Sequence, residues 1–179
     1  PFIFIYKNKS DFENDSFTWE LRKKYGFDPI ELENNEVKQL LPGLSEEYTF
    51  AIKINNQGYI SNSQNYLNDL INGFKELGGE IVEDEVIDII SKENQVEIKT
   101  KNNNLNADNI LISSGIYSES FSKKFGIDVP IQSERGYHLE LFETNIRIKY
   151  PIMNGYLKLA ITPRPSGIRF AGLVEFGSM

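Results

Sequence analysis

The alternation of apolar and polar residues predicts a series of short elements in the first part of the chain. Phe2 to Tyr6 is an unbroken apolar run, which is typical of a strand covered on both faces. Asp28-Pro29 then precedes a brief strand at 30–32 and a helix over 34–41, which Pro42-Gly43 terminates. The alternating pattern at 48–54 predicts another strand.

Between these elements, a single helix is predicted from Ser10 to Tyr25. Ser10 suits the N-cap, and Phe17, Leu21 and Tyr25 recur every four residues on one face. Trp19 falls off that stripe, so we expect it to be only partly buried.

The clearest helical pattern begins at Ser63 and ends at Gly78-Gly79. Its apolar residues recur at helical spacing and form one stripe, which we expect to lie in the core: Tyr66, Leu67, Leu70, Ile71, Phe74 and Leu77.

Residues 80–115 change to short β-rich runs. The runs at 81–82, 86–90 and 96–100 are separated by polar turns, including the asparagines at 102–104, and predict a β-meander. The meander leads to Asn109–Gly115, an apolar run that ends in two serines and a glycine before a predicted helix at 117–125. This pattern predicts a buried strand with a tight turn at its carboxyl end, where a glycine admits a ligand close to the backbone.

After a linker at 126–130, four strand candidates at 135–142, 146–150, 156–162 and 167–176 predict an antiparallel sheet. The predicted fold class is therefore α+β, with a mixed or antiparallel sheet and flanking helices.

Composition narrows the possible functions. The 179 residues are 40% hydrophobic, which suits a globular chain, and the absence of cysteine excludes disulfides and thiolate metal sites. A net charge of −7, with 19 basic residues scattered among 26 acidic ones, argues against a nucleic-acid surface. No apolar stretch has the length of a membrane span.

Several segments in a fixed order resemble the FAD-dependent amine and D-amino-acid oxidoreductases, a family that includes glycine oxidase, sarcosine oxidase and bacterial D-amino-acid dehydrogenase. The resemblance is carried by Gln57–Ile60, Leu77–Gly79, Val86, Ala107–Gly115, Val129-Pro130, Arg135–His138, Ile161–Pro163 and Gly167–Phe176. The last three segments are most similar to the small subunit of the dehydrogenase.

The resemblance implies a division into a substrate lobe at 1–76 and 129–179, and the β-meander and return strand of an FAD lobe at 77–128. The chain departs from the family pattern because it has no G-x-G-x-x-G loop to hold the FAD pyrophosphate. It also lacks the later stretch that completes the flavin site and supplies a carboxylate-binding arginine. We therefore expect it to be the middle of a longer enzyme.

For the cofactor, the resemblance implies that backbone groups of Val86 contact the adenine end of FAD, and that Ser113, Ser114 and Gly115 lie against the cofactor. An ordinary strand residue at 86 and ordinary turn chemistry at 113–115 are the alternatives. No cluster of His, Asp and Glu has metal-ligand spacing, so no metal site is predicted.

For the substrate, the resemblance implies catalytic or binding roles for Tyr137, His138 and Tyr156. Tyr137 and His138 are adjacent in a predicted strand, so they face opposite sides and cannot line the same pocket. The residue type of His138 makes it a candidate base, although a single histidine in a strand is more often a hydrogen-bonded structural residue. Tyr156 offers a hydroxyl on an apolar ring to a substrate carboxylate. Arg164 and Arg169 could attract a carboxylate as bidentate donors. Arg164 lies in a predicted turn and Arg169 alternates outward from its apolar neighbours, so both are expected to be solvated.

The function implied for the full-length protein is oxidative deamination of a D-amino acid, with hydride transfer to FAD and electrons passing to an unidentified acceptor. Another amine flavoenzyme, such as a glycine or sarcosine oxidase or a tRNA-modifying demethylase, and a non-catalytic ligand-binding domain are the alternatives. The expected partner is a small amino acid, and the expected location is the cytoplasm, with peripheral membrane association left open.

The missing phosphate-binding loop yields a first prediction. The 179-residue chain purified by itself binds FAD weakly or not at all, because the residues that hold the pyrophosphate are not in it. Its absorbance spectrum after incubation with FAD and gel filtration measures this. A stoichiometric flavin band that survives the column contradicts the prediction.

Overall fold

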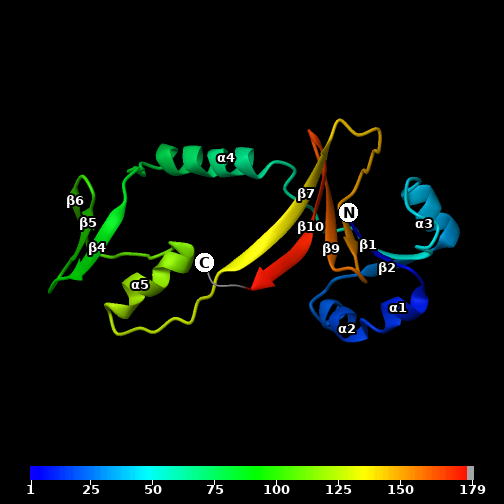
Figure 1. The fold of residues 1–179 in the computed structure, drawn as a ribbon, viewed down its shortest axis with the longest axis horizontal. Coiled ribbons are helices and arrows are strands. Elements are labelled where there is room, and N and C mark those ends of the chain that lie inside the picture. The colour runs from blue at the N-terminus through cyan, green and yellow to red at the C-terminus, as the bar shows by residue number, and fades with distance from the viewer. Residues whose placement is uncertain (177–179) are drawn as a thin grey trace. The chain divides into compact units, whose positions relative to one another are not determined.

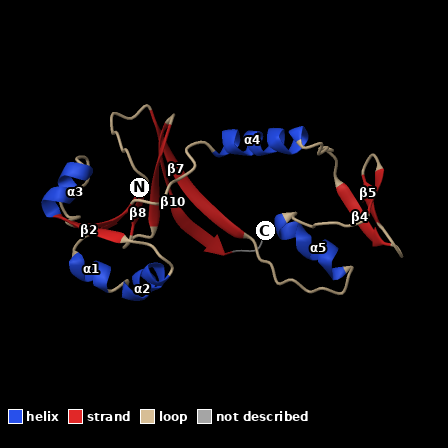
Figure 2. Ribbon diagram, turned by 180° about the vertical axis from the view of Figure 1, so that it is seen from behind, coloured by secondary structure: helices blue, strands red, loops and turns tan. Residues whose placement is uncertain are grey.

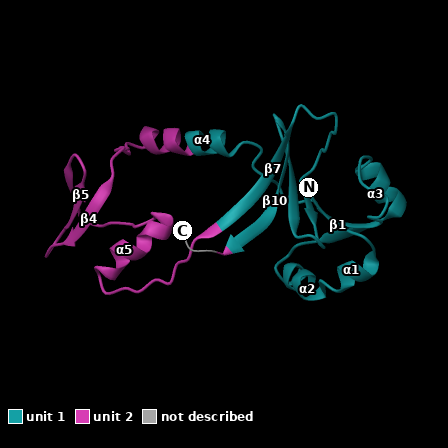
Figure 3. Cartoon of the chain, viewed as in Figure 1, with its two compact units in different colours: residues 1–69, 135–175 teal, residues 70–134, 176–179 magenta. Residues whose placement is uncertain are grey.

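The computed structural model describes residues 1–176, which divide into two compact units (Figure 3). The first unit contains residues 1–69 and 135–175, and the second contains residues 70–134 and continues at Phe176. The first unit is thus assembled from two segments that are distant in the sequence.

A seven-stranded mixed sheet forms the first unit, in the order β2-β3-β1-β8-β9-β10-β7 (Figure 1). Its strands are β1 (Phe2–Tyr6), β2 (Pro29–Glu33), β3 (Phe50–Ile54), β7 (Glu134–Phe142), β8 (Ile152–Asn154), β9 (Leu159–Arg164) and β10 (Gly167–Phe176). The central pair β1–β8 is parallel, and β2–β3, β1–β3, β8–β9 and β9–β10 are antiparallel. The predicted α+β class with a mixed sheet and flanking helices is confirmed.

Helices cover the two faces of β1, as the unbroken apolar run predicts. Alternate residues point to opposite faces of a strand, so Phe4 and Tyr6 pack in one core with α1 (Lys9–Glu13) and α2 (Ser16–Lys24). Ile3 and Ile5 pack in the other core with α3 (Asn34–Leu40). Figure 2 shows α3 on the other side of β2 from α1 and α2.

The single helix predicted from Ser10 to Tyr25 is wrong, because the chain forms two helices there. Asn8, not Ser10, is the first N-cap, and its side chain accepts a hydrogen bond from the backbone N–H of Asp11. The break falls at Asp15, whose carboxylate accepts hydrogen bonds from the Tyr6 hydroxyl and from Thr18.

The expectations for this helical stretch are also wrong about burial. Trp19 is 2% exposed and donates its indole N–H to the Tyr6 hydroxyl at 2.8 Å. Phe17 and Tyr25, from the predicted apolar stripe, are 77% and 72% exposed. The break at Asp15 selects which face of α2 meets the sheet, and a tertiary hydrogen bond to β1 overrides the local pattern.

In the second unit, β4 (Val86–Ser91), β5 (Val96–Thr100) and β6 (Asn104–Ala107) form an antiparallel sheet in that order. This agrees with the predicted meander, except that Ile81-Val82 lies outside the strands and Asn104 begins a strand instead of ending a turn. The Asp84 carboxylate accepts hydrogen bonds from Thr100 and from both Asn102 and Asn103, which fixes the turn between β5 and β6.

The strand predicted at 109–115 is wrong for the described residues. Residues 109–114 have no regular structure, and Leu111 is 88% exposed. A strand needs a hydrogen-bonded neighbour, and within residues 1–176 no strand pairs with this segment. The helix expected after it is present as a short 3-10 turn, η1 (Gly115–Tyr117), followed by α5 (Ser118–Lys123).

The helix predicted from Ser63 is confirmed as α4 (Ser63–Glu76), but its apolar stripe is not core in the part of the chain that the structure describes. Tyr66, Leu67, Leu70 and Phe74 are each 50–53% exposed. Among the described residues, no helix combines the length and the apolar composition needed to cross a membrane.

The C-terminal strands differ in detail from the prediction. Residues 146–150 form no strand, whereas Ile152–Asn154 does, and β9 starts at Leu159 after a turn in which Lys158 has a φ of 53°. On β10, Gly167 and Gly172 have φ values of 147° and 151° and approach the backbones at Leu141 and Lys158 too closely for a side chain.

The opposite burial of two neighbouring aromatic residues yields a second prediction. Trp19→Ala lowers the free energy of unfolding by about 3–5 kcal/mol, because it empties a buried site. The matched control Phe17→Ala changes it by less than about 0.5 kcal/mol, because that side chain is exposed. Urea denaturation followed by circular dichroism measures both, and equal losses contradict the observed packing.

Candidate functional site

The sheet face that α1 and α2 cover also carries the polar groups of β7, β9 and β10. Met153 of β8 packs against the core beneath these helices and lies opposite Ala160 of β9. Thr162 is two residues further along β9 and therefore faces the same side, and it pairs directly with Arg169 of β10. This register places the Arg169 side chain on the α1/α2 side of the sheet.

Two arginines on this face share one carboxylate. The Arg164 guanidinium donates to Glu140 Oε1 at 3.4 Å, and Arg169 Nε lies 4.0 Å from the same oxygen. The side chains of Arg164, Arg169 and Glu140 are 23%, 34% and 22% exposed. Together these three groups carry one net positive charge in a half-buried position.

Both arginines have unused hydrogen-bonding capacity. Their Nε atoms are buried and have no hydrogen-bond partner among the described residues. A buried donor without a partner costs free energy, which a suitable acceptor restores. The three residues (the Arg164–Arg169–Glu140 cluster) therefore form a site suited to an oxygen anion.

The expectation that Arg164 and Arg169 are solvated is wrong. Arg169 does alternate with Ile168 and Phe170, as the pattern implied, but the face it occupies is shared with Arg164 and Glu140 and is partly covered. Alternation along each of β7, β9 and β10 shows which residues share a face with Glu140, Arg164 or Arg169. Placing these three residues on the same face of the sheet also requires the register between the strands.

The structure places Tyr137 and His138 on opposite faces of β7, as their adjacency requires. His138 is two residues before Glu140 and thus shares the face of the cluster. Tyr137 donates its hydroxyl to Glu175 at 2.5 Å, and Glu175 also lies 3.5 Å from Arg135. Among the described residues, Tyr137 is therefore bonded to Glu175 and to none of the three cluster residues, while the imidazole of His138 is exposed.

Tyr156 lies in the turn between β8 and β9, beside a polar cavity of about 260 Å³. Its backbone N–H donates to Asn154 Oδ1 at 3.1 Å, and its ring is 65% exposed. The Lys7 amine lies 5.5 Å from the centre of the ring. Tyr6, Asp15 and Lys158 also line the cavity.

Two of the residues that line this cavity, Tyr6 and Asp15, belong to a hydrogen-bonded chain. The indole of Trp19 donates to the Tyr6 hydroxyl, which donates to Asp15 Oδ2 at 3.0 Å, and the Lys158 amine is 3.8 Å from the same carboxylate. Burial, aided by the Asp15 carboxylate, raises the pKa of Tyr6 to about 12. Tyr6 is thus a neutral donor that holds Asp15 in place.

The structure does not bring Tyr156 into contact with the candidates on β7. β9 and β10 lie between β8 and β7, which separates those strands by roughly 14 Å at the usual spacing. Tyr156 and the cluster can therefore engage only different parts of one ligand.

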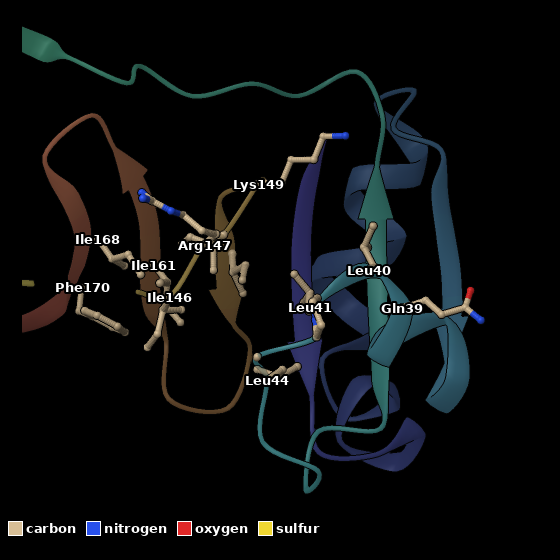
Figure 4. A pocket seen from close by; sticks show the side chains of 14 residues that line it. Gln39, Leu40, Leu41, Leu44, Ile146, Arg147, Lys149, Ile161, Ile168 and Phe170 are labelled. Atoms are coloured by element: carbon tan, nitrogen blue, oxygen red, sulfur yellow. The ribbon is translucent and has the colours of Figure 1, made fainter. Parts of the chain in front are cut away.

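A larger cavity of about 420 Å³ lies on the opposite face of the sheet, beside α3 (Figure 4). Leu41, Leu44, Ile146 and Ile161 point into it, whereas the Lys149 amine points away from it. Apart from Gln39, Arg147 and Lys149 its lining is apolar, whereas the cluster on the other face offers two guanidinium groups and a carboxylate to a small polar substrate.

The residues predicted to contact FAD lie in the second unit. Val86 begins β4, next to an irregularity in its pairing with β5, and is 38% exposed. Gly115 has a φ of 59° and open space where a side chain would be, and the Ser114 N–H donates to Ser118 Oγ at 3.1 Å. The exposed serines and the bare glycine backbone fit a polar cofactor edge, so these residues are compatible with FAD.

A metal site needs several possible ligand side chains close together. Within 1–176, no group of three His, Cys, Asp or Glu side chains is arranged to hold a metal ion.

Comparison with known proteins identifies the family. The model of the FAD dependent oxidoreductase family matches residues 3–178, so the chain belongs to this family. The expected resemblance is thereby confirmed.

Individual relatives agree with this assignment. The chain is 26% identical to a D-amino-acid oxidase of Bradyrhizobium diazoefficiens over 178 residues, which is 99% of the chain and 42% of that protein. Its fold is similar to glycine oxidase from Bacillus cereus, with a TM-score of 0.76 and 20% identity over 98% of this chain and 48% of that one. It is also similar to L-alpha-glycerophosphate oxidase from Mycoplasma pneumoniae with FAD bound, with a TM-score of 0.81 and 14% identity over 99% and 50%. The chain thus spans about half the length of the relatives it matches.

The Tyr6 hydroxyl yields a third prediction, on pH. Its pKa is about 12 in the folded state and near 10 when unfolded, so the folded state keeps the proton more tightly. The Tyr6 hydroxyl therefore makes its full contribution to the free energy of unfolding below pH 10. This contribution is lost as the pH rises toward 12, which lowers the free energy of unfolding by on the order of 1–2 kcal/mol. Urea midpoints at pH 9 and pH 11 measure the change.

Tyr6→Phe is the matched variant for this measurement. It is less stable at pH 9, because Trp19 and Asp15 lose their partner, but its stability falls less between pH 9 and pH 11. If the stability of Tyr6→Phe and of the unchanged protein falls equally between pH 9 and pH 11, the assignment of this pH dependence to Tyr6 is contradicted.

Proposed function

We propose that this chain is the substrate-binding part of a flavoenzyme that oxidatively deaminates D-amino acids, of the D-amino-acid dehydrogenase type. The observation that carries the proposal is the half-buried cationic cluster on one sheet face, in a chain of the FAD dependent oxidoreductase family. The similarity to a D-amino-acid oxidase over 99% of the chain supports the D-amino acid as substrate.

Bound FAD would supply the hydride acceptor for oxidation at the substrate Cα. The substrate amine loses a proton in that oxidation, the imino acid is hydrolysed by water to an oxo acid and ammonia, and the two electrons pass on to an unidentified acceptor. The chain's own residues orient the substrate. Tyr156 donates its hydroxyl to the substrate carboxylate from the turn between β8 and β9, and His138 hydrogen-bonds the substrate from β7. Tyr137 contributes through its hydrogen bond to Glu175, which anchors the end of β10 beside β7.

In this proposal the second unit supplies cofactor contacts. Val86 offers backbone groups to the adenine end, and Ser113, Ser114 and Gly115 lie against the cofactor. The division into a substrate lobe at 1–76 and 129–179 and an FAD-lobe meander at 77–128 belongs to the same proposal.

Anaerobic reduction of the flavin in the full-length gene product tests the function. We expect D-amino acids to bleach the visible absorbance of the oxidised flavin, and L-amino acids, glycine and sarcosine to leave it unchanged. Bleaching by glycine or sarcosine assigns another amine oxidase activity instead. A protein that takes up no flavin is a non-catalytic binding domain.

Tyr156→Phe in the same protein tests the proposed donor. Loss of one hydrogen bond to a charged group raises KM for the best D-amino acid roughly tenfold or more, with a smaller change in kcat. Tyr25→Phe is the control, since Tyr25 is similarly exposed on α2. Equal KM values for Tyr156→Phe and the unchanged protein contradict the role.

A further inference from the structure

The Arg164–Arg169–Glu140 cluster points to a substrate with a second acidic group. We propose that Arg169, supported by Arg164, binds a carboxylate on the substrate side chain, so that the enzyme prefers dicarboxylic amino acids. This inference rests on the proposed function, because it names the substrate class of the same site.

Charge balance is the first argument. Two guanidinium groups face one carboxylate, so the Arg164–Arg169–Glu140 cluster is one negative charge short of neutrality in a partly buried position. Interactions between charges are stronger there than in bulk water. An anion at this point is stabilised, and a cationic side chain is repelled.

Hydrogen-bonding capacity is the second argument. Glu140 is within hydrogen-bond distance of Arg164 but is 4.0 Å from Arg169, so Arg169 is the less satisfied of the two. The buried Nε of Arg169 has no partner among the described residues. The Arg169 side chain is 34% exposed, and a guanidinium group matches the two oxygens of a carboxylate in a bidentate pair.

Placement on the sheet is the third argument. Arg169 pairs with Thr162 on β9, whereas Tyr156 lies six residues before Thr162 in the turn that precedes the same strand. The two candidate groups therefore approach a ligand from separate points, Tyr156 from the turn and Arg169 from β10. A substrate with two carboxylates supplies an acceptor to each.

Flanking glycines hold Arg169 in this place. Gly167 and Gly172 bring β10 into close contact with the backbones of β7 and β9, which fixes the strand that carries Arg169. A donor on a fixed strand loses little conformational entropy when it binds a ligand.

Matched pairs of substrates test the proposal in the full-length, flavin-loaded protein. Glutamate and glutamine, and aspartate and asparagine, have nearly the same shape and differ in charge, and both enantiomers of each are used. We expect kcat/KM for the acids to exceed that for the amides roughly tenfold or more. Arg169→Gln removes this preference, because kcat/KM falls more for the acids than for the amides.

Two further variants serve as controls. Arg147→Gln removes an exposed arginine outside the Arg164–Arg169–Glu140 cluster, and we expect it to keep the preference for acids over amides. Arg169→Lys keeps the positive charge, and we expect it to retain part of that preference. Binding without turnover is read from thermal stabilisation, which we expect to be larger with glutarate than with butyrate, and to lose this difference in Arg169→Gln.

The outcomes separate the two proposals. Reduction of the flavin by neutral amino acids in preference to acidic ones overturns the dicarboxylic assignment and leaves the proposed function standing. Equal losses for acids and amides in Arg169→Gln also overturn it, because they indicate a structural role. If no amino acid reduces the flavin, and glutarate stabilises no better than butyrate, both proposals fail.

Discussion

The parallel pairing of β1 with β8 is the interaction on which the first unit depends. β1 is contributed by the start of the chain and β8 by residues about 150 positions later, and their ladder runs from Ile3 opposite Ile152 to Ile5 opposite Asn154. Backbone bonds from Ile3 N–H to Pro151 and from Gly155 N–H to Ile5 extend it at both ends. In the sheet, β9, β10 and β7 are joined through β8 to the strands that carry the two helix-covered cores, and Ile161 of β9 also packs against one of them.

The same junction positions the turn that carries Tyr156. Asn154 is 3% exposed, and its side chain accepts from the N–H groups of Tyr156 and Leu157 while donating to the Tyr48 hydroxyl. A buried polar group with all its partners specifies one conformation more strictly than an apolar one. The backbone of the candidate Tyr156 is therefore held in place by the buried side chain of Asn154 at the end of β8.

Sequence reasoning succeeded where a pattern depends on neighbouring residues alone. The unbroken run Phe2–Tyr6, the helix from Ser63 and the β-meander after Val86 all follow from local periodicity. It failed where distant residues decide: Asp15 breaks a helix because Tyr6 binds it, and Trp19 is buried for the same reason. The cluster was missed because Glu140, Arg164 and Arg169 become neighbours only through the strand register.

The two glycines of β10 have a consequence for how such a site changes over evolutionary time. Positions 167 and 172 are fixed by backbone contact, since any larger residue would displace β7 or β9. Position 169 between them makes no comparable backbone demand, and its side chain meets Glu140 at the limit of an ion pair. One strand thus combines two positions where backbone contacts exclude a side chain with one, between them, that carries a side chain on a partly covered face. Under the role proposed for Arg169, its replacement would change the ligand preference without touching the two glycine contacts that hold β10.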